Sequence, residues 1–377
     1  MIPINRPWID DEEKQEVMRV LDENILTSAS RDGGKRVQEF ESSLKGFLNV
    51  KHVISVNSGT AALHASLLAI GVTSGDEVLL PSFTFVATAN SVIAAGAKPV
   101  FVDINKKDYT IDIPDLKKKI TKKTKAIIPV HLYGHPADLD ELAEISKQNS
   151  FDIIEDACQS LGSTYKNKQT GTFGKLGCFS FYASKVLTAG EGGAIVTNDD
   201  KIADTLKMIR NHGMVEGYDT RIPGFNYRLP ELSAALAKIQ MRKINQILKI
   251  RRRNSQLLSN FIERSISNFQ VLNIPEENHI KKFNWYLYTL GFIGNKGSEL
   301  RERIKKKMIE GGIGVSVYYD PPVHLTPYYK QFSFEGSLTN TESASKTVLS
   351  FPVHPYVTET DVEKMVNILK EELPIFV

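Results

Sequence analysis

Four polar segments each place reactive side chains directly beside an apolar run. In the first, NSGTAALHASL, Ser58, Gly59 and Thr60 stand between a strand-like run and a helical pattern. Free backbone N–H groups, the helix dipole and hydroxyls converge at such a junction, and together they favour a phosphate-sized anion. The plainer alternative is a helix N-cap without a ligand. The segment therefore indicates either a phosphate site or a cap.

Two charged side chains, Asp156 and Lys185, could serve catalysis. Asp156, in IIEDACQS, follows a run typical of a buried strand, and ligands usually lie at the carboxyl ends of parallel strands. A structural salt bridge or a helix cap would also satisfy this carboxylate. Lys185, in SFYASKVLTAGEGG, lies in a loop whose glycines allow close backbone approach to a ligand, although a lone lysine is most often a solvated surface residue. The fourth segment, GFNYRLPE, places Asn226 and Arg228 before a long helical pattern.

Several other chemistries are excluded by motifs that the sequence lacks. It contains no G-x-x-x-x-G-K-[ST], no G-x-G-x-x-G after a strand and no G-x-S-x-G. Cys158 and Cys178 are the only cysteines, so a disulfide framework and a cysteine-built metal site are unavailable, and the cytoplasm is the expected location. His131 and His135 are four residues apart, but Gly134 and a following proline disfavour a shared helix face. No metal site is expected.

The elements that must position these segments alternate between strand and helix. Short apolar, β-rich runs are each followed by a helical pattern through the first two-thirds of the chain. The strand-like runs are nearly continuous in hydrophobicity, as expected when helices cover both faces of a sheet. The alternation predicts an α/β fold with a mostly parallel sheet and right-handed crossovers. The expected strands are HVISV, EVLL, KPVFVDI, KAIIPV, FDIIEDA, CFSFY and GGAIVTN.

A long helix is predicted from about 230 to 261, where apolar residues recur at helical spacing without an internal proline or glycine. We expect it to join a large domain, residues 1–240 with the N-terminal segment included, to a smaller C-terminal α/β domain, residues 241–377. In the smaller domain WYLYTLGFI and GVSVYY resemble strands, and SELRERIKKKMIEGG and TETDVEKMVNILKEEL resemble helices.

Composition and charge exclude further classes of protein. The 377 residues are 41% hydrophobic and 24% charged, which is ordinary for a globular chain, and the formal net charge of +3 does not indicate nucleic-acid binding. Basic runs at Lys117, Arg251 and Lys305 fall in helical patterns, and a solvated helix face is the favoured interpretation of each. The uncharged stretch Val78–Ala97 contains a proline, an asparagine and a glycine, so it predicts a buried strand and helix rather than a membrane span. Neither nucleic acid nor membrane is an expected partner.

Taken together and in this order, the segments resemble the DegT-type family of sugar-nucleotide aminotransferases. The resemblance runs from NRPWIDDEEKQEV to LSFPVHPYVTETDVEKMV, and its most specific block extends from IIEDACQS through GTFGKLGCFSFYASKVLTAGEGGAIVTND. The family uses pyridoxal 5′-phosphate (PLP) and has the aspartate-aminotransferase fold, type I. The resemblance therefore implies a large domain with a helix-covered, mostly parallel sheet and a smaller C-terminal α/β domain.

The resemblance also implies roles for three residues at the cofactor ring. Lys185 matches the lysine that forms the Schiff base with PLP and then moves a proton. Asp156 matches the carboxylate that keeps the pyridine nitrogen protonated, and Gln159 matches a residue near the phenolic oxygen. PLP acts as an electron sink, so a protein must orient it and tune its ring.

Further contacts are implied around the ring. Phe85 matches an aromatic that stacks on the cofactor, and Asn226 matches a residue that reaches the phosphate of the neighbouring subunit, which implies a homodimer with shared active sites. Arg228, Tyr319 and His324 are the candidate substrate contacts. The phosphate-binding candidates are Ser58, Gly59, Thr60 and Ser180.

The implied activity is transamination of a nucleotide-linked keto-sugar, with glutamate as the expected amino donor and pyridoxamine 5′-phosphate (PMP) formed in the half-reaction. The product would be an amino-sugar nucleotide for glycan or secondary-metabolite biosynthesis. Amination at C3 or C4 and a UDP, GDP or dTDP carrier all stay open. One alternative is a PLP-dependent sugar dehydratase, but those relatives carry histidine where this chain has Lys185. Another is a non-catalytic regulatory protein on the same fold.

Overall fold

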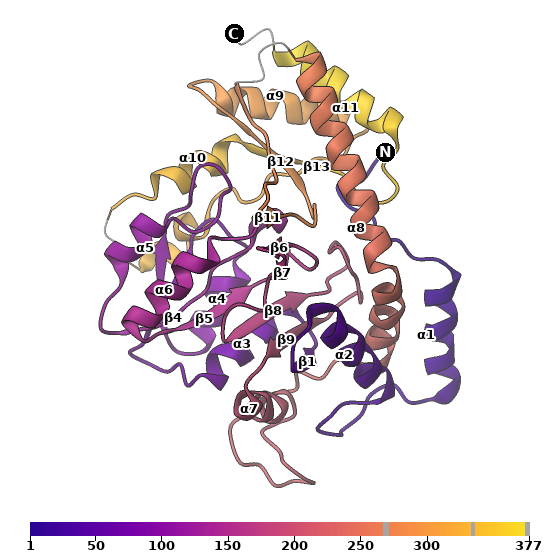
Figure 1. The fold of residues 1–377 in the computed structure, drawn as a ribbon, viewed down its shortest axis with the longest axis vertical. Coiled ribbons are helices and arrows are strands. Elements are labelled where there is room, and N and C mark those ends of the chain that lie inside the picture. Colours follow the sequence, from indigo (N-terminus) through magenta and orange to yellow (C-terminus); the bar gives the residue numbers. More distant parts are fainter. Residues whose placement is uncertain (267–270, 333–335, 374–377) are drawn as a thin grey trace.

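The computed structural model describes residues 1–266, 271–332 and 336–373. At its centre lies a sheet of seven strands: β1 (His52–Val56), β2 (Glu77–Pro81), β3 (Lys98–Val102), β4 (Thr124–Ile127), β5 (Asp152–Asp156), β8 (Leu176–Ser180) and β9 (Gly193–Thr197). Their order is β1-β9-β8-β5-β4-β2-β3 (Figure 1). Only β9 runs against its neighbours in this sheet, whereas β8, β5, β4, β2 and β3 pair in parallel. The prediction of a mostly parallel α/β sheet is confirmed.

Side chains along the central strands alternate between two hydrophobic cores. In β2, Val78 and Leu80 pack into one core while Leu79 packs into the other. In β5, Ile154 packs into the first of these cores and Ile153 into the second. This alternation follows from the two-residue period of a strand. Because both faces are buried, the strands are nearly continuous in hydrophobicity.

Helices cover both faces of the sheet. One face is packed by α3 (Gly59–Ala69), α4 (Ala87–Ala94) and α7 (Asp200–Arg210). The other face is packed by α2 (Lys35–Leu48), α5 (Ile113–Lys119), α6 (Leu139–Asn149) and the first half of α8 (Glu231–Ser265). Outside this layer, α1 (Asp11–Glu23) lies against α8 (Figure 1).

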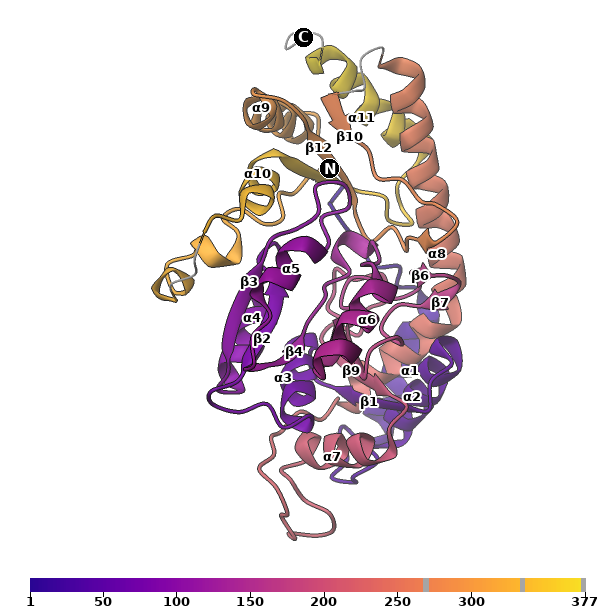
Figure 2. The same ribbon diagram turned by 60° about the vertical axis from the view of Figure 1, so that its left-hand side comes forward.

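The predicted long helix is α8, whose 35 residues extend about 52 Å at 1.5 Å per residue. It runs from the large sheet to a second layer at the opposite end of the molecule (Figure 2). That layer has an antiparallel sheet in the order β10-β12-β13, packed against two helices. Its elements are β10 (Leu272–Asn273), β12 (Tyr288–Phe292), α9 (Gly297–Glu310), β13 (Val348–Phe351) and α11 (Glu359–Glu372).

We propose residues 1–240 and 241–377 as the two structural units, with segments of each crossing to the other. At the N-terminus, Ile2 forms a parallel bridge with Ile313 of the smaller unit. In the other direction, α10 (Thr339–Thr347) caps the large unit, since the Thr341 backbone N–H donates to Asp103 at 2.8 Å. Each unit thus receives a segment from the other.

One predicted strand is absent from its expected place. GVSVYY makes only an isolated bridge, between Ser316 and Ser350, and then turns back toward the large sheet. The two prolines that follow have no N–H to donate to a ladder, so the pairing ends there. The remaining short elements are the sheet β11 (Lys281–Lys282), β6 (Thr164–Tyr165) and β7 (Lys168–Gln169), and 3₁₀ turns at Leu132–Gly134, Val323–Leu325 and Tyr329–Gln331.

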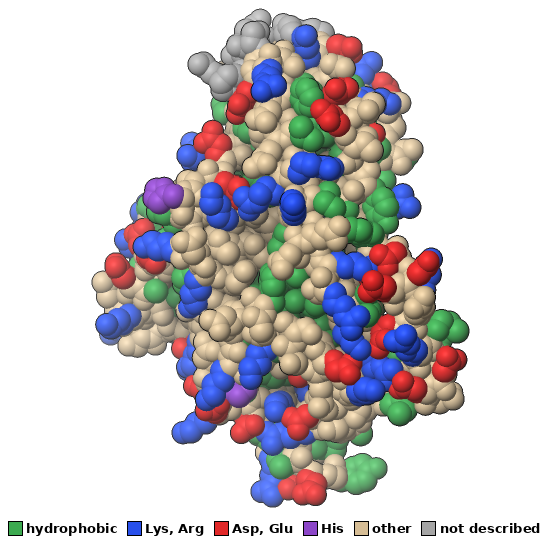
Figure 3. Space-filling view, turned by 45° about the vertical axis from the view of Figure 1, so that its right-hand side comes forward, with side chains coloured by type: hydrophobic (Ala, Val, Ile, Leu, Met, Phe, Trp, Pro, Cys, Tyr) green, Lys and Arg blue, Asp and Glu red, His purple; other side chains and the backbone are tan. Residues whose placement is uncertain are grey.

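The surface carries charges of both signs. On the face shown in Figure 3, Lys and Arg side chains intermix with Asp and Glu, in keeping with a net charge of only +3. None of the helices within the described ranges is both long and apolar enough to span a membrane. Across the same ranges, no group of three or more His, Cys, Asp or Glu side chains could hold a metal ion.

Candidate active site

A cavity of about 640 Å³ lies at the carboxyl end of the parallel strands. The chain segments that directly follow β1, β2, β5 and β8 all contribute to its wall. Parallel strands end at one edge of the sheet, so residues far apart in sequence meet there. Nine residues singled out from the sequence line this cavity: Ser58, Gly59, Thr60, Phe85, Asp156, Gln159, Ser180, Lys185 and Tyr319.

The floor of the cavity is formed by the N-terminus of α3. The Ser58 hydroxyl caps the helix by accepting from the Ala61 backbone N–H at 3.1 Å. The N–H groups of Gly59 and Thr60 precede the first intrahelical bond and point out of the helix end. A Cβ at Gly59 would come within 2.9 Å of both Cys158 Sγ and Ser180 Cβ. A side chain at residue 59 would therefore force Cys158 or Ser180 to shift, and the Ser58 cap leaves the N–H groups of Gly59 and Thr60 open to an anion. We call Ser58, Gly59, Thr60 and Ser180 the anion cup.

Two adjacent carboxylates at the end of β5 have opposite environments. Glu155 is fully buried on one face, where it accepts from the N–H groups of Gly171 and Phe173 at 2.7 and 2.6 Å and lies 2.9 Å from His131 Nε2. Asp156 faces the cavity from the other side of the strand. The strand period of two separates a structural carboxylate from one that is available to a ligand. His131 is therefore engaged in the core.

Asp156 is held in place from two sides. Its Oδ2 accepts from the Thr88 hydroxyl at 2.9 Å, and its Oδ1 accepts from the Cys158 N–H at 3.2 Å. Neither neighbour is a cation, and no basic side chain in the described ranges forms a salt bridge with it. A buried carboxylate that has hydrogen-bond donors but no cation beside it suits a ligand that carries positive charge.

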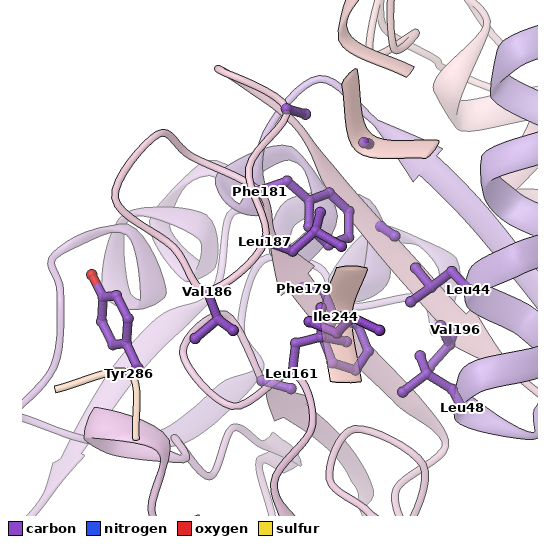
Figure 4. Packing of buried hydrophobic residues seen from close by; sticks show 14 of the residues in the cluster. Leu44, Leu48, Leu161, Phe179, Phe181, Val186, Leu187, Val196, Ile244 and Tyr286 are labelled. Carbon is purple, nitrogen blue, oxygen red and sulfur yellow. The ribbon is translucent and has the colours of Figure 1, made fainter. Parts of the chain in front are cut away.

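Lys185 lies in the loop after β8 and reaches the cavity from a rigid base. The next two residues, Val186 and Leu187, are buried in the core beside Phe179 and Ile244 (Figure 4). The ammonium nitrogen of Lys185 stands 4.6 Å from the centre of the Tyr286 ring. Apolar anchors on one side of the lysine hold its backbone against the core.

Aromatic rings line the opposite wall. Gln159 donates to the Tyr319 hydroxyl at 3.1 Å, and burial raises the pKa of Tyr319 well above its ordinary value. Phe85 lies at the mouth, 56% exposed, with its ring centre 6.2 Å from that of Tyr319. The Tyr133 backbone N–H donates to the side-chain oxygen of Gln159 at 2.9 Å, which fixes the orientation of the Gln159 amide. An exposed aromatic at the mouth suits stacking on a planar ring.

Three residues singled out from the sequence lie outside the cavity lining. Asn226 is exposed, and its backbone carbonyl accepts from the Asn57 side chain at 3.1 Å. Arg228 donates to the Asn211 side-chain oxygen at 2.6 Å. His324 is 0% exposed, and its Nδ1 lies 2.6 Å from the Ser82 hydroxyl, so this histidine joins the segment after Tyr319 to the end of β2 and offers no surface to a substrate.

Other cavity residues were not identified from the sequence. Thr88 lies within an apolar helical stretch, and Tyr182 lies three residues before Lys185, which is the one local signal that could have marked it. The rest are Leu63, Thr84, Ala87, Cys158, Ser184, Glu191 and Tyr286. Thr84, Cys158 and Ser184 each adjoin a residue singled out from the sequence, whereas Tyr286 reaches the cavity only through the fold. Tyr318, next to Tyr319 in GVSVYY, lines the cavity as well.

The donor set fits PLP. The anion cup suits a phosphate, Asp156 lacks the cation that a pyridinium would supply, and Lys185 is the only lysine or arginine on the wall of the cavity as the described residues form it. Phe85 is placed to cover a ring. The residues present thus satisfy each part of the cofactor.

Comparison with known proteins supports the same conclusion. The model of the DegT/DnrJ/EryC1/StrS aminotransferase family matches residues 7–370. The chain is 37% identical to the pleiotropic regulatory protein of Geobacillus stearothermophilus, covering 98% of each chain. It is 33% identical to the GDP-perosamine synthase of Caulobacter vibrioides, covering 99% of this chain and 98% of that one. Among solved structures, the PLP form of Spr1654 from Streptococcus pneumoniae has a TM-score of 0.90 at 26% identity, covering 100% and 99% of the two chains.

Proposed function

Because the chain belongs to the PLP-dependent DegT/DnrJ/EryC1/StrS aminotransferase family, we propose that it transfers an amino group from glutamate to a keto group of a nucleotide-linked sugar. The observation that carries this proposal is the meeting of Lys185, Asp156 and the anion cup in one cavity. The product is an amino-sugar nucleotide for glycan or secondary-metabolite biosynthesis. Lys185 favours transamination over dehydration, because the related dehydratases carry histidine at that position.

Each proposed cofactor residue has a distinct task. The anion cup binds the phosphate, and Asp156 holds the proton on the ring nitrogen. When bound, PLP supplies an electron sink for the carbanion that forms beside the amino group. Lys185 Nζ would hold the cofactor between reactions and, once free as an amine, would accept a proton and return it. Phe85 covers the ring and keeps water from its face.

The aromatic wall suits a sugar substrate. Tyr286, Tyr318 and Tyr319 present ring faces together with hydroxyls, and such side chains contact both the apolar face and the hydroxyls of a sugar ring. We propose that Tyr319 contacts the sugar. We also propose that Arg228 binds a phosphate of the substrate, for which its guanidinium must give up the hydrogen bond to Asn211. Both cysteines are free thiols, which supports a reducing, cytoplasmic setting.

The direct test of this function is a substrate panel. Purified protein with PLP and glutamate is incubated with 3-keto and 4-keto sugars carried on UDP, GDP or dTDP, and the products are identified by mass spectrometry. We expect an amino-sugar nucleotide and 2-oxoglutarate in equal amounts. No amination of any of these sugars, by a protein shown to hold PLP, would contradict the proposal.

A regulatory role is the second candidate, because a relative that is 37% identical is named as a pleiotropic regulatory protein. The two candidates differ in the state of Lys185. Catalysis requires a yellow, PLP-bound protein whose chromophore borohydride reduces onto Lys185, whereas a bare scaffold gives no labelled peptide. Peptide mapping after reduction separates them.

We propose a homodimer in which Asn226 completes the partner's site. Asn226 is exposed and lies outside the cavity of its own chain, although its loop is tied to the start of the anion cup through Asn57. Phe225 beside it is 37% exposed. A two-fold axis would make the exchange reciprocal, with each protomer lending one asparagine and receiving one.

Subunit complementation tests this arrangement. Lys185→Ala is mixed with Asn226→Asp, in which a carboxylate would repel the phosphate. In a mixed dimer one site has both native residues and the other has neither, so activity should return to about half of the wild-type value per mixed dimer. Mass spectrometry verifies the exchange. A verified mixed dimer without activity, or a fully active monomer in ultracentrifugation, would overturn the shared site.

Gly59→Ala should weaken PLP binding. The added Cβ would press on Cys158 Sγ and Ser180 Cβ at 2.9 Å and displace the N–H groups of the anion cup. A loss of about 1.4 kcal/mol of binding free energy there corresponds to a tenfold rise in the Kd for PLP. Gly46→Ala is the matched control, since its Cβ meets nothing within 4 Å on α2. Titration of apoenzyme with PLP, followed by fluorescence, measures both. Wild-type affinity in Gly59→Ala would place the phosphate elsewhere.

A further inference from the structure

Arg251 is a cation buried in the interior of the protein. It lies in the middle of α8 and is 2% exposed, and the acidic side chains of the described ranges form no salt bridge with it. The expectation of a solvated helix face for this basic run is wrong at Arg251, although Arg253 beside it is exposed. Burial lowers the pKa of Arg251 to about 10. An unpaired buried charge is costly, so the bonds that it makes instead need an explanation.

Within the part of the chain that the structure describes, the acceptors of the Arg251 guanidinium are all neutral. Its Nη1 donates to the backbone carbonyls of Trp285 and Tyr286 at 3.3 and 3.2 Å. Its Nη2 donates to the side-chain oxygen of Asn5 at 2.6 Å. One planar group thus joins the long helix, the irregular segment that leads into β12 and the N-terminal segment. Arginine suits this task because its donors form a rigid fork.

Both neighbours of the guanidinium lead to Lys185. The Asn5 amide donates to the backbone carbonyl of Ser184, the residue before the lysine. The ring of Tyr286 lies 4.6 Å from the lysine nitrogen, and its hydroxyl lies 3.3 Å from the Ser184 hydroxyl. Arg251 therefore fixes the backbone on one side of Lys185 and the ring on the other.

The N-terminal segment is itself anchored. The Ile2 N–H donates to the Gly312 carbonyl at 2.8 Å, and His354 Nε2 lies 3.0 Å from the Pro3 carbonyl. The Arg6 guanidinium stands 4.3 Å from the centre of the Tyr356 ring. Asn5 is thus held on the smaller unit while its amide reaches the loop of the large unit.

We propose that Arg251, acting through Asn5 and Tyr286, is a positioning residue that sets the direction of the Lys185 side chain. This inference rests on the proposed function of Lys185. A displacement of the reacting Lys185 nitrogen by about 1 Å can lower a rate by on the order of 10²-fold. Arg251 does not line the cavity, but it can therefore control turnover through the position of that nitrogen. Arg251 and Asn5 should act as one unit.

The test uses Arg251→Met, Asn5→Ala, the double variant and the control Arg253→Met, whose native side chain is exposed and, among the described residues, bonds only to the adjacent Asn254. The readout is the pH midpoint of the visible absorbance of bound PLP, measured without substrate, together with kcat and KM. We expect the midpoint to move by about one pH unit, a tenfold change in the proton equilibrium, in both single variants. We also expect kcat to fall about tenfold or more, with KM within twofold, and the double variant to lose less than the summed effects.

A merely structural role predicts a different pattern. It would lower the unfolding midpoint and leave the absorbance titration of the folded holoenzyme unchanged. An unchanged titration in both single variants, or an equal shift in Arg253→Met, would overturn the proposal. If Arg251→Met does not fold, Asn5→Ala decides by the same titration. The proposed function is judged separately, since borohydride must label Lys185 in the wild-type protein; without that label both fail.

Discussion

Lys185→Ala is expected to abolish turnover in a protein that folds and still binds PLP through the anion cup. The variant loses both the attachment of the cofactor and the group that moves the proton. Proton transfer by a placed side chain alone contributes about 10²–10⁴-fold, so kcat should fall by at least roughly 10³-fold. Initial rates with glutamate and the keto-sugar nucleotide, measured with added PLP, check the change.

A second lysine provides the control for Lys185→Ala. Lys175 lies in the same region of the chain, but it forms a surface salt bridge with Asp152 at 3.0 Å. Lys175→Ala should keep wild-type kcat, because an exposed ion pair contributes little to stability and Lys175 does not line the cavity. Near-normal turnover in Lys185→Ala would remove this lysine from the mechanism.

Asp156→Asn should lower kcat by about 10²–10³-fold, the usual effect of removing one electrostatic group that acts on the transition state. The shape is preserved, because an amide can accept from the Cys158 N–H and donate to the Thr88 hydroxyl, which also lies 3.0 Å from Thr84. The charge that keeps the ring nitrogen protonated is lost. We therefore expect a modest change in KM for the sugar, and steady-state kinetics separates the two constants.

Glu155→Gln is the matched control for Asp156→Asn, since it removes one charge from the neighbouring position of the same strand. Glu155 accepts from backbone N–H groups in the core, so an amide nitrogen there would face a donor and lower the free energy of unfolding by about 1–3 kcal/mol. The kcat of folded Glu155→Gln should stay close to the wild-type value. If Asp156→Asn kept wild-type kcat, Asp156 would be structural and the cofactor would be oriented otherwise.

The sequence by itself was sufficient for the large sheet, the long helix and much of the site. Its strands are short apolar runs whose side chains are buried on both faces, a pattern that local composition records directly. The segments around Ser58, Asp156 and Lys185 each follow such a strand, and parallel strands end at one edge, so their meeting was predictable. GVSVYY was misleading because apolar alternation does not show whether a neighbouring strand is present to pair with it.

Only the tertiary structure decided which of the polar residues face the cavity. Glu155 and Asp156 are adjacent carboxylates, and the packing of β5 sends one into the core and the other to the cavity. His324 is buried against Ser82, and Arg251, within a basic run that reads as solvated, is buried beside Asn5. The burial of His324 and of Arg251 depends on contacts between residues more than 200 positions apart, and local spacing carries no information about such contacts because the chain must close a long loop to form them.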